Sequence, residues 1–248
     1  MPEPNSSEFF GGDYQIAYAD MLATIDSAGQ VRFIAEKLAL RQGEAVLDTV
    51  CGHGRHAIPL ATAGYRLTGA DRSEVEIGRA RQAAVAAGVD ARFVVSDMRD
   101  LPFAAEFDAA YNVFTSFGYF EDEAEDRRAL RAFRHALKPG GRFLIDTINP
   151  LALARSFMPR RWERTAAGAL VLRESRWDFL EGVLRESLTL SAEGRDRTHE
   201  LLIRMYTPDA LRRALEVEGF RVREAYGSFD GSALGLGSAR LILIAEAA

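Results

Sequence analysis

The sequence offers little from which a covalent or metal-based scaffold could be built. Cys51 is the single cysteine among 248 residues, so the chain can form neither an intramolecular disulfide nor a zinc site with two cysteines. Of the four histidines, only His53 and His56 lie close together in the sequence, and no suitable cluster of acids accompanies them. We therefore expect no bound metal.

Long apolar runs and an excess of positive charge are also missing. No stretch approaches the ~18 uninterrupted apolar residues that cross a bilayer. Residues 1–4 lack the basic and then apolar pattern of a signal peptide. The net charge is −5, whereas nucleic acids and anionic membranes attract basic surfaces. We therefore expect a cytoplasmic protein that binds neither a membrane nor a nucleic acid.

The rest of the composition is that of a globular chain. Hydrophobic residues make up 48% and charged residues 27% of the sequence, both near the usual values. A chain of this length buries roughly 70% or more of its unfolded surface without a covalent staple. One α/β domain with an insertion fits the length as well as two domains do.

Short apolar segments alternate with amphipathic segments from about Gly43 to Ile148. Strands are expected over 45–47, 66–70, 91–95, 107–113 and 142–148, and helices over 55–63, 73–87 and 122–137. Such alternation is typical of a parallel sheet covered by helices on both faces. Sheets of this type bind ligands beyond the carboxyl ends of their strands.

The pattern changes between residues 150 and 206. Antiparallel strands are expected over 169–177, 183–191 and 198–206. The segment contains ten arginines and eight acids, which favours a solvated face of ion pairs over an anion-binding surface. A helix then begins at Thr207, and strands over 220–228 and 240–245 are expected to pair antiparallel.

The segment from Val46 to Ala57 carries the strongest indication of chemistry, because it predicts a strand, a glycine-rich loop and a helix. Gly52 and Gly54 allow the main chain to approach a ligand, and the helix N-terminus offers free N–H groups. Asp71 ends the next strand, where an acid accepts both hydroxyls of a ribose. Asp97 ends the third strand and can accept a hydrogen bond from an adenine amino group, with Met98 beside the base. The pattern indicates an adenosine-containing cofactor.

The same loop also matches the dinucleotide-binding fingerprint over residues 52–57, so an NAD(P)-dependent oxidoreductase is one alternative. Such an enzyme needs a second mononucleotide-binding half, whereas this chain changes to antiparallel strands after residue 148. It also has no need of Asp48 ahead of the loop. A protein that binds the cofactor without catalysis is a second alternative.

Taken together, these segments resemble the class I S-adenosylmethionine-dependent methyltransferases. The matching blocks are Val46 to Gly54, Thr68 to Ser73, Ser96 to Met98, Phe107 to Ala110 and Leu137 to Gly141. The family's loop usually carries a glycine where this chain has Val50. The resemblance implies an α/β, Rossmann-like, doubly wound and mostly parallel seven-stranded sheet. It further implies a C-terminal antiparallel hairpin and an inserted antiparallel β cap.

The resemblance also implies a function and an organisation. The cofactor would be S-adenosyl-L-methionine, whose methyl group passes to an N or O nucleophile of a small molecule, mainly through proximity and orientation. Residues 1–42 would form an N-terminal helical lid, and residues 43–149 with 207–248 the cofactor-binding domain. Residues 150–206 would form a substrate cap.

Site residues follow from the same resemblance. The expected cofactor-binding residues are Asp48, Cys51, Gly52, His53, Gly54, Asp71, Arg72, Ser73, Asp97, Met98 and Asn112. The expected substrate-facing residues are Tyr14, Tyr18, Phe117 and Tyr119, of which the first two lie one helical turn apart. We predict no catalytic residue, because the sulfonium is already an activated leaving group and no base motif is recognisable.

Overall fold

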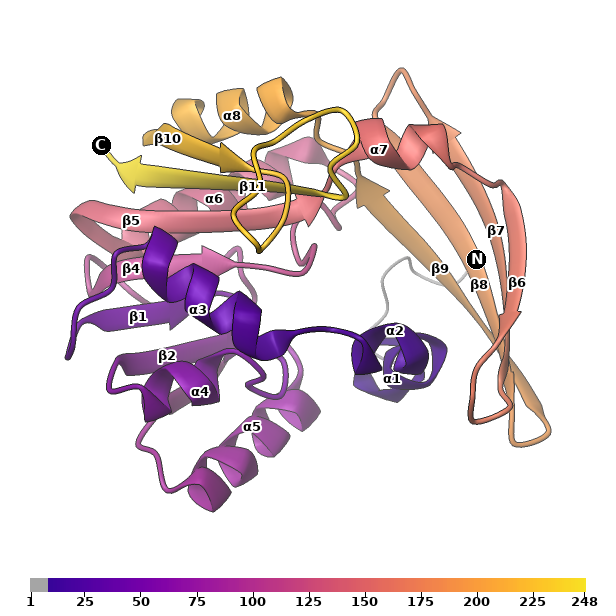
Figure 1. Cartoon of the computed structure of the whole chain (residues 1–248), viewed down its shortest axis with the longest axis horizontal. Helices are drawn as coiled ribbons and strands as arrows, with labels where there is room; N and C mark the ends of the chain where they lie inside the picture. Colours follow the sequence, from indigo (N-terminus) through magenta and orange to yellow (C-terminus); the bar gives the residue numbers. More distant parts are fainter. Residues whose placement is uncertain (1–8) are drawn as a thin grey trace.

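A seven-stranded sheet forms the centre of the molecule in the computed structural model, which describes residues 9–248 (Figure 1). In sheet order the strands are β10 (Phe220–Tyr226), β11 (Arg240–Ala247), β5 (Leu137–Ile148), β4 (Phe107–Asn112), β1 (Ala45–Asp48), β2 (Arg66–Asp71) and β3 (Arg92–Val95). Strands β1 to β5 are mutually parallel, and β11 is antiparallel to β5 and β10. The predicted doubly wound sheet and its C-terminal hairpin are confirmed.

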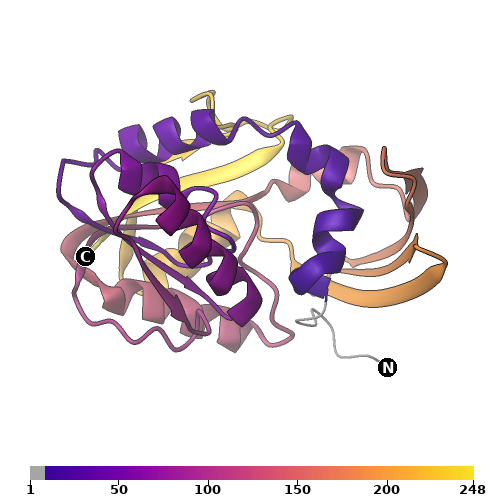
Figure 2. The same ribbon diagram turned by 90° about the horizontal axis from the view of Figure 1, so that it is seen from below.

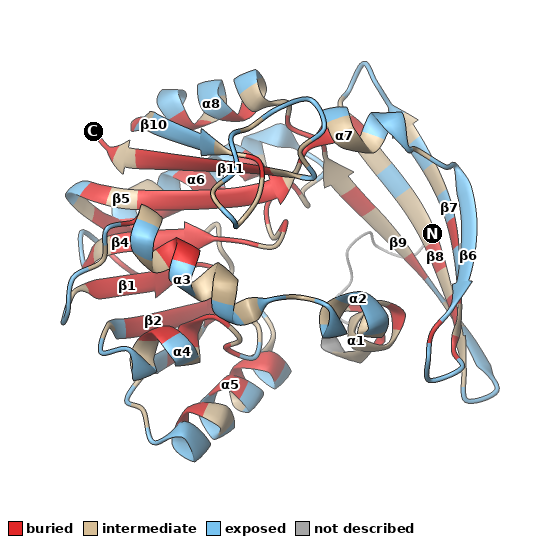
Figure 3. Cartoon of the chain, in the orientation of Figure 1, coloured by how far each residue is buried: buried red, intermediate tan, exposed pale blue. Residues whose placement is uncertain are grey.

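Helices cover both faces of this sheet. The helices of one face are α3 (Ser27–Lys37), α4 (Ala57–Thr62) and α5 (Glu74–Ala87), and those of the other are α6 (Glu123–Ala136) and α8 (Pro208–Val217). Successive strand residues point to opposite faces, so Val46 joins the core under the first group and Leu47 the core under the second. The central strands are accordingly buried along most of their length (Figure 3).

Helix α5 shows how the sequence sets the ends of these elements. The Ser73 hydroxyl accepts a hydrogen bond from the Glu76 amide at 3.2 Å, which caps the first turn. Gly88 ends the helix in the left-handed conformation, with φ 66°. The helix therefore begins and ends where the sequence predicts.

A second, four-stranded antiparallel sheet follows β5. Its strands in order are β6 (Arg160–Arg164), β7 (Leu170–Asp178), β8 (Val183–Ala192) and β9 (Arg195–Arg204), preceded by helix α7 (Pro150–Arg155). Neither α7 nor β6 was expected from the sequence. Helix α7 is a six-residue helix capped by Asn149, and every residue of β6 is exposed, so neither produces an apolar repeat.

The segment of residues 9–23 lies between the two sheets (Figures 1 and 2). A helical turn over Phe9–Asp13 leads into α1 (Tyr14–Ala17), which packs against the second sheet. Helix α2 (Ala19–Ala23) follows, and its Asp20 accepts the Ala166 N–H between β6 and β7 at 3.0 Å. Residues 1–8 of the predicted lid lie outside the described residues. No described helix has the length and apolar character needed to cross a membrane.

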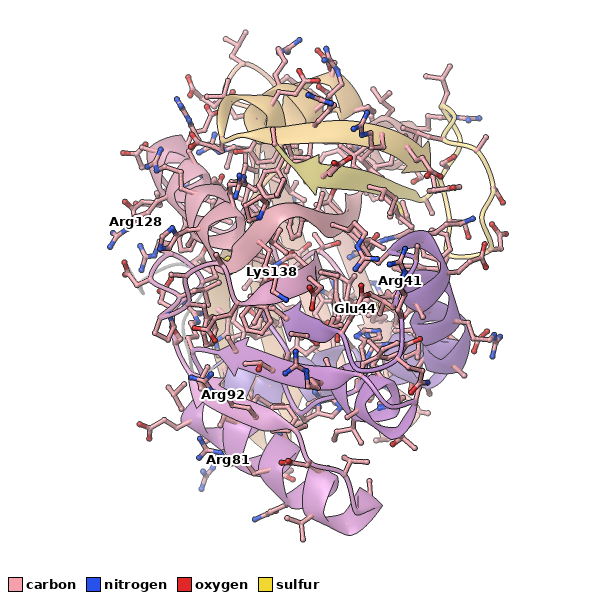
Figure 4. The ribbon with its side chains drawn as sticks, turned by 90° about the vertical axis from the view of Figure 1, so that its left-hand side faces the viewer. Arg41, Glu44, Arg81, Arg92, Arg128 and Lys138 are labelled. Carbon is pink, nitrogen blue, oxygen red and sulfur yellow. The ribbon has the colours of Figure 1, made fainter. Side chains whose placement is uncertain are left out.

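The two ends of the central sheet differ in character. The strand amino ends carry many charged side chains, including Glu44, Arg92 and Lys138 (Figure 4). Ion pairs join Lys138 to Asp108 at 2.5 Å and Arg142 to Glu44 at 2.7 Å. The carboxyl ends of β1, β2, β4 and β5 instead point toward the second sheet (Figure 1).

Candidate functional site

A cavity of about 380 Å³ lies at the carboxyl ends of β1 to β4, within the usual size range of small-molecule sites. The N-terminal residues Phe10, Tyr14 and Leu22 form one side of it. Ten of the residues predicted from the sequence line it: Cys51, Gly52, His53, Asp71, Arg72, Ser73, Asp97, Met98, Tyr14 and Tyr119. Five do not: Asp48, Gly54, Asn112, Tyr18 and Phe117.

The glycine-rich loop is held tightly against β2. Gly52 and Gly54 adopt φ values of 51° and 88°, which other residues rarely adopt. The Cys51 amide donates to the Ala70 carbonyl at 2.8 Å. A Cβ at Gly69 would lie 2.8 Å from the Cys51 sulfur, so the close approach of loop and strand requires glycine there.

Asp71 joins this loop to the start of α5. One carboxylate oxygen accepts the Gly52 N–H and the other accepts the Ser73 N–H, both at 2.9 Å. The side chain lines the cavity, and burial raises its pKa. Each oxygen keeps a second lone pair, so the carboxylate can still accept bonds from two neighbouring hydroxyls.

Asp97 is engaged differently, since it pairs with a residue that the sequence reasoning did not consider. Arg99 donates from Nε to one carboxylate oxygen at 2.9 Å and from Nη2 to the other at 2.8 Å. Arg99 also pairs with Glu125 on α6 at 2.6 Å. Asp97 therefore fixes Arg99 at the cavity wall and has less free acceptor capacity than Asp71.

Asp48 and Asn112 lie behind the loop. Burial is the main cause that raises the pKa of Asp48 to about 7, although the neighbouring Tyr111 hydroxyl and Val50 amide lower it. The Asn112 amide donates to the Thr49 hydroxyl at 2.9 Å and so joins β4 to the loop. Its carbonyl oxygen is buried without a hydrogen-bond partner among the described residues. In this structure both residues support the cavity wall from behind.

Arg55 is a cavity residue that the sequence reasoning missed. Its guanidinium lies 4.7 Å from the centre of the Phe114 ring and donates to Gln30 at 3.2 Å and Ser27 at 3.3 Å. Burial lowers its pKa. These contacts join a cation to neutral acceptors, so the guanidinium is suited to hold an anionic group of a ligand. Its position directly after Gly54 was the available signal.

The tyrosines of the N-terminal helices have different surroundings. The rings of Tyr14 and Tyr18 lie 4.8 Å apart, as expected for one helical turn. Tyr14 faces the cavity, and burial raises its pKa. Tyr18 turns to the second sheet, where its hydroxyl accepts from Arg173 at 2.8 Å. Phe117 packs on Tyr206 in the core, with ring centres 5.5 Å apart.

The second sheet contacts the N-terminal helices and does not line the cavity with any described residue. Several of its arginines are engaged in ion pairs, among them Arg173 with Glu186 at 2.8 Å, Arg197 with Asp13 at 2.7 Å and Arg204 with Asp126 at 3.2 Å. These pairs support the interpretation of its arginines as partners of nearby acids. Among the described residues, no group of three or more histidines, cysteines and acids is arranged to hold a metal.

Comparison with known proteins places the chain among methyltransferases. Residues 46–141 match the family of methyltransferase domains. An S-adenosyl-L-methionine-dependent Diels-Alderase of Talaromyces variabilis is 30% identical over 68% of this chain and 61% of its own length. An uncharacterized methyltransferase of Synechocystis sp. is 35% identical over 54% of this chain and 63% of its own length. The chain thus spans less than two thirds of these relatives.

Solved structures share the whole fold. An S-adenosylmethionine-dependent methyltransferase from Clostridium acetobutylicum ATCC 824 superposes with a TM-score of 0.82 and 17% identity, over 96% of this chain and 98% of that one. The strand order, the glycine-rich loop and the matched domain agree with one another. Residues 46–141 therefore form a methyltransferase domain, and the fold of the chain is that of the S-adenosylmethionine-dependent methyltransferases.

Proposed function

We propose that the protein transfers a methyl group from S-adenosylmethionine to a nitrogen or oxygen nucleophile of a small molecule. The observation that carries the proposal is the position of Asp71. Its carboxylate ends β2, holds the glycine-rich loop through Gly52 and opens into the cavity. In a matched methyltransferase domain, this is where the ribose of the cofactor would lie.

The remaining cavity residues fit the other parts of the cofactor. The flat side of the adenine would pack on Met98, next to Asp97. The methionine part would lie along Gly52, with its carboxylate near the Arg55 guanidinium. Because Arg55 has neutral partners, an ionised ligand would gain a charge-assisted hydrogen bond there.

The protein's contribution to the reaction is then mainly geometric. The bound cofactor supplies a methyl group on a positively charged sulfur, which is already activated for transfer. The cavity walls would bind and orient donor and acceptor, and Tyr14 and Leu22 of the N-terminal helices form one side of the cavity. Alignment of two reactants can lower a barrier by roughly 7–11 kcal/mol at best. No general base is needed for a neutral amine acceptor.

The acceptor would enter between the N-terminal helices and the end of β4. Phe10, Tyr14, Phe114 and Tyr119 line that part of the cavity, which favours a molecule with apolar surface. A cavity of about 380 Å³ suits a small molecule better than a nucleic acid. A cytoplasmic location and the absence of a nucleic-acid partner stay predictions from the sequence.

We also propose a division of labour among the three segments. Residues 43–149 and 207–248 would bind the cofactor. Of the predicted lid, residues 1–42, the part from Phe10 to Leu22 would cover it, whereas α3 packs on the central sheet. The segment 150–206 acts mainly by holding that cover, through Asp13 and Tyr18. On this proposal its arginines influence the acceptor through the lid and not by direct contact.

A second candidate is a reaction that uses bound S-adenosylmethionine without transferring its methyl group. The relative named as a Diels-Alderase favours it, as does a cavity in which we identify no base. This candidate predicts that the cofactor is required and is not consumed.

One experiment separates the two. The protein is incubated with S-adenosylmethionine labelled in the methyl group and with panels of small amines, phenols and hydroxy acids, and labelled product and S-adenosylhomocysteine are measured. Equal amounts of both products, lost in the Asp71→Ala variant, would support methyl transfer. Bound cofactor with neither product from any panel, in a protein that converts a diene substrate, would support the second candidate instead.

A further inference from the structure

The cavity wall at the end of β4 has a strained backbone. Phe114 and Thr115 have φ values of 65° and 59°, in the left-handed region. Residues with a side chain seldom adopt this region, and β-branched residues such as threonine avoid it most. Both residues line the cavity, and so does Ser116. The corner formed by residues 114–116 therefore needs support from outside itself.

That support comes from two residues far away in the sequence. Asp146 on β5 is fully buried, and its carboxylate accepts the Phe114 N–H at 2.7 Å. Its main-chain carbonyl accepts the Thr115 N–H at 3.1 Å. Arg240, the first residue of β11, donates to both carboxylate oxygens at 2.7 Å and to the Thr115 hydroxyl at 2.9 Å. Three strands thus converge on one corner.

A stabilising role alone does not explain this arrangement. Burying an acid and an arginine together costs desolvation that apolar residues of similar volume avoid. Strained residues persist only where their surroundings hold them firmly, and they cluster at functional sites. Here the strained residues line the cavity, and the Phe114 ring also contacts the Arg55 guanidinium.

We propose that Asp146 and Arg240 are positioning residues that fix the corner of residues 114–116, against which donor and acceptor are aligned. The inference rests on the proposed methyl transfer for its functional part. A displacement of about 1 Å at such a wall can lower a rate by about 10²-fold, because alignment supplies much of the catalysis. The conformation of this corner can be measured in the protein without any ligand.

The first test is therefore hydrogen exchange of the main-chain amides in the Asp146→Ala and Arg240→Lys variants. We expect exchange at Phe114 and Thr115 to rise at least tenfold in Asp146→Ala and less in Arg240→Lys, with β1 and β2 unchanged. The control is Glu246→Ala, which removes the carboxylate partner of Arg223 on the same hairpin, far along β11. Unchanged exchange at the corner in both variants would overturn the proposal.

If Asp146→Ala does not fold, the test uses Arg240→Lys and the double variant Thr115→Gly/Arg240→Lys. Glycine adopts positive φ freely, so Thr115→Gly combined with Arg240→Lys should restore slow exchange at Phe114. Failure of the double variant to recover any protection would count against the strain-holding role.

The second test uses the acceptor found in the labelled-methyl assay. We expect Asp146→Ala to lower kcat at least tenfold while the KM for S-adenosylmethionine changes less than threefold. A purely structural role would instead lower the melting temperature and raise that KM, leaving kcat per folded molecule unchanged. If the wild-type protein transfers no methyl group, the proposed function fails and the exchange result still decides whether Asp146 and Arg240 hold the corner.

Discussion

At the scale of single residues, the cavity contrasts two acids with different surroundings. Asp71 lines the cavity and accepts two main-chain N–H groups. Asp48 is 1% exposed and accepts a long hydrogen bond from the Val50 amide at 3.4 Å, with the Tyr111 hydroxyl nearby. The first is suited to bind a ligand, whereas the second supports the loop from behind at a cost in charge burial.

Replacing Asp71 should weaken cofactor binding. We expect Asp71→Ala to reduce the affinity for S-adenosylhomocysteine by about 1.5–3 kcal/mol, the usual value for hydrogen bonds to a charged group. Calorimetric titration measures this, with the exposed Asp90→Ala as the matched control. An unchanged affinity in a folded variant would remove Asp71 from the ribose site.

Replacing Asp48 should change how stability depends on pH. Because its pKa is raised to about 7, the folded state keeps a proton that the unfolded chain has lost above about pH 4. Stability therefore falls as the pH rises from about 4 to 7, by at most about 4 kcal/mol.

The Asp48→Asn variant lacks this loss. In urea unfolding, its free energy of unfolding minus that of the wild-type protein should be near zero at pH 4 and greatest above pH 7. An advantage that is the same at pH 5 and pH 8 would show that Asp48 is ionised in the folded protein across this range.

At the scale of elements, the N-terminal helices belong to the second sheet as much as to the cavity. Asp13 accepts hydrogen bonds from Arg197 and from His199, both at 2.7 Å. Arg173 is 2% exposed and contacts the Tyr18 hydroxyl and the Ala17 carbonyl. The helices and the second sheet are therefore expected to open and close together.

Breaking that attachment should loosen the cover over the cavity. Losing a hydrogen bond to a charged group costs about 1.5 kcal/mol or more, so Asp13→Ala should increase opening of residues 14–23 about tenfold. Hydrogen exchange of that segment and the dissociation rate of S-adenosylhomocysteine measure the effect. The exposed Asp196→Ala on β9 is the control. Equal exchange in both variants would contradict the attachment.

The strands and helices of the central sheet were predictable because each depends on a pattern of neighbouring residues. The alternation of strand and helix, the cap at Ser73 and the glycine at Gly88 all act within a few residues. Helix α7 and strand β6 were not predictable, since α7 has only six residues and β6 is exposed throughout. Their conformation depends on neighbours far along the chain.

The same distinction separates the predicted and the missed parts of the site. Acids at strand ends were predictable because parallel strands bring their carboxyl ends to one edge of the sheet. The pairing of Asp146 with Arg240 joins residues 94 positions apart, so no local pattern reveals it. The four-residue spacing of Tyr14 and Tyr18 predicts that both lie on one helix face. Only the contact of Tyr18 with Arg173 shows that its side chain points away from the cavity.

At the scale of the whole molecule, one cavity lies between the carboxyl ends of the central sheet and the N-terminal helices, which contact the second sheet. A ligand that binds only the folded protein stabilises it by about 2.7 kcal/mol at one hundred times its Kd. For a chain of this size, S-adenosylhomocysteine at that concentration should raise Tm by roughly 5–11 °C. In the Asp71→Ala variant the same concentration should produce a clearly smaller shift, and an identical shift would contradict the assignment of the cavity.

We expect this cavity to bind S-adenosylmethionine and not a nicotinamide dinucleotide. This is measured by calorimetric titration of the purified protein with S-adenosylmethionine, S-adenosylhomocysteine and NADH. We predict binding of the first two with one site per chain and no heat of binding with NADH. Binding of NADH alone would contradict the account, because the glycine-rich loop would then serve a redox cofactor.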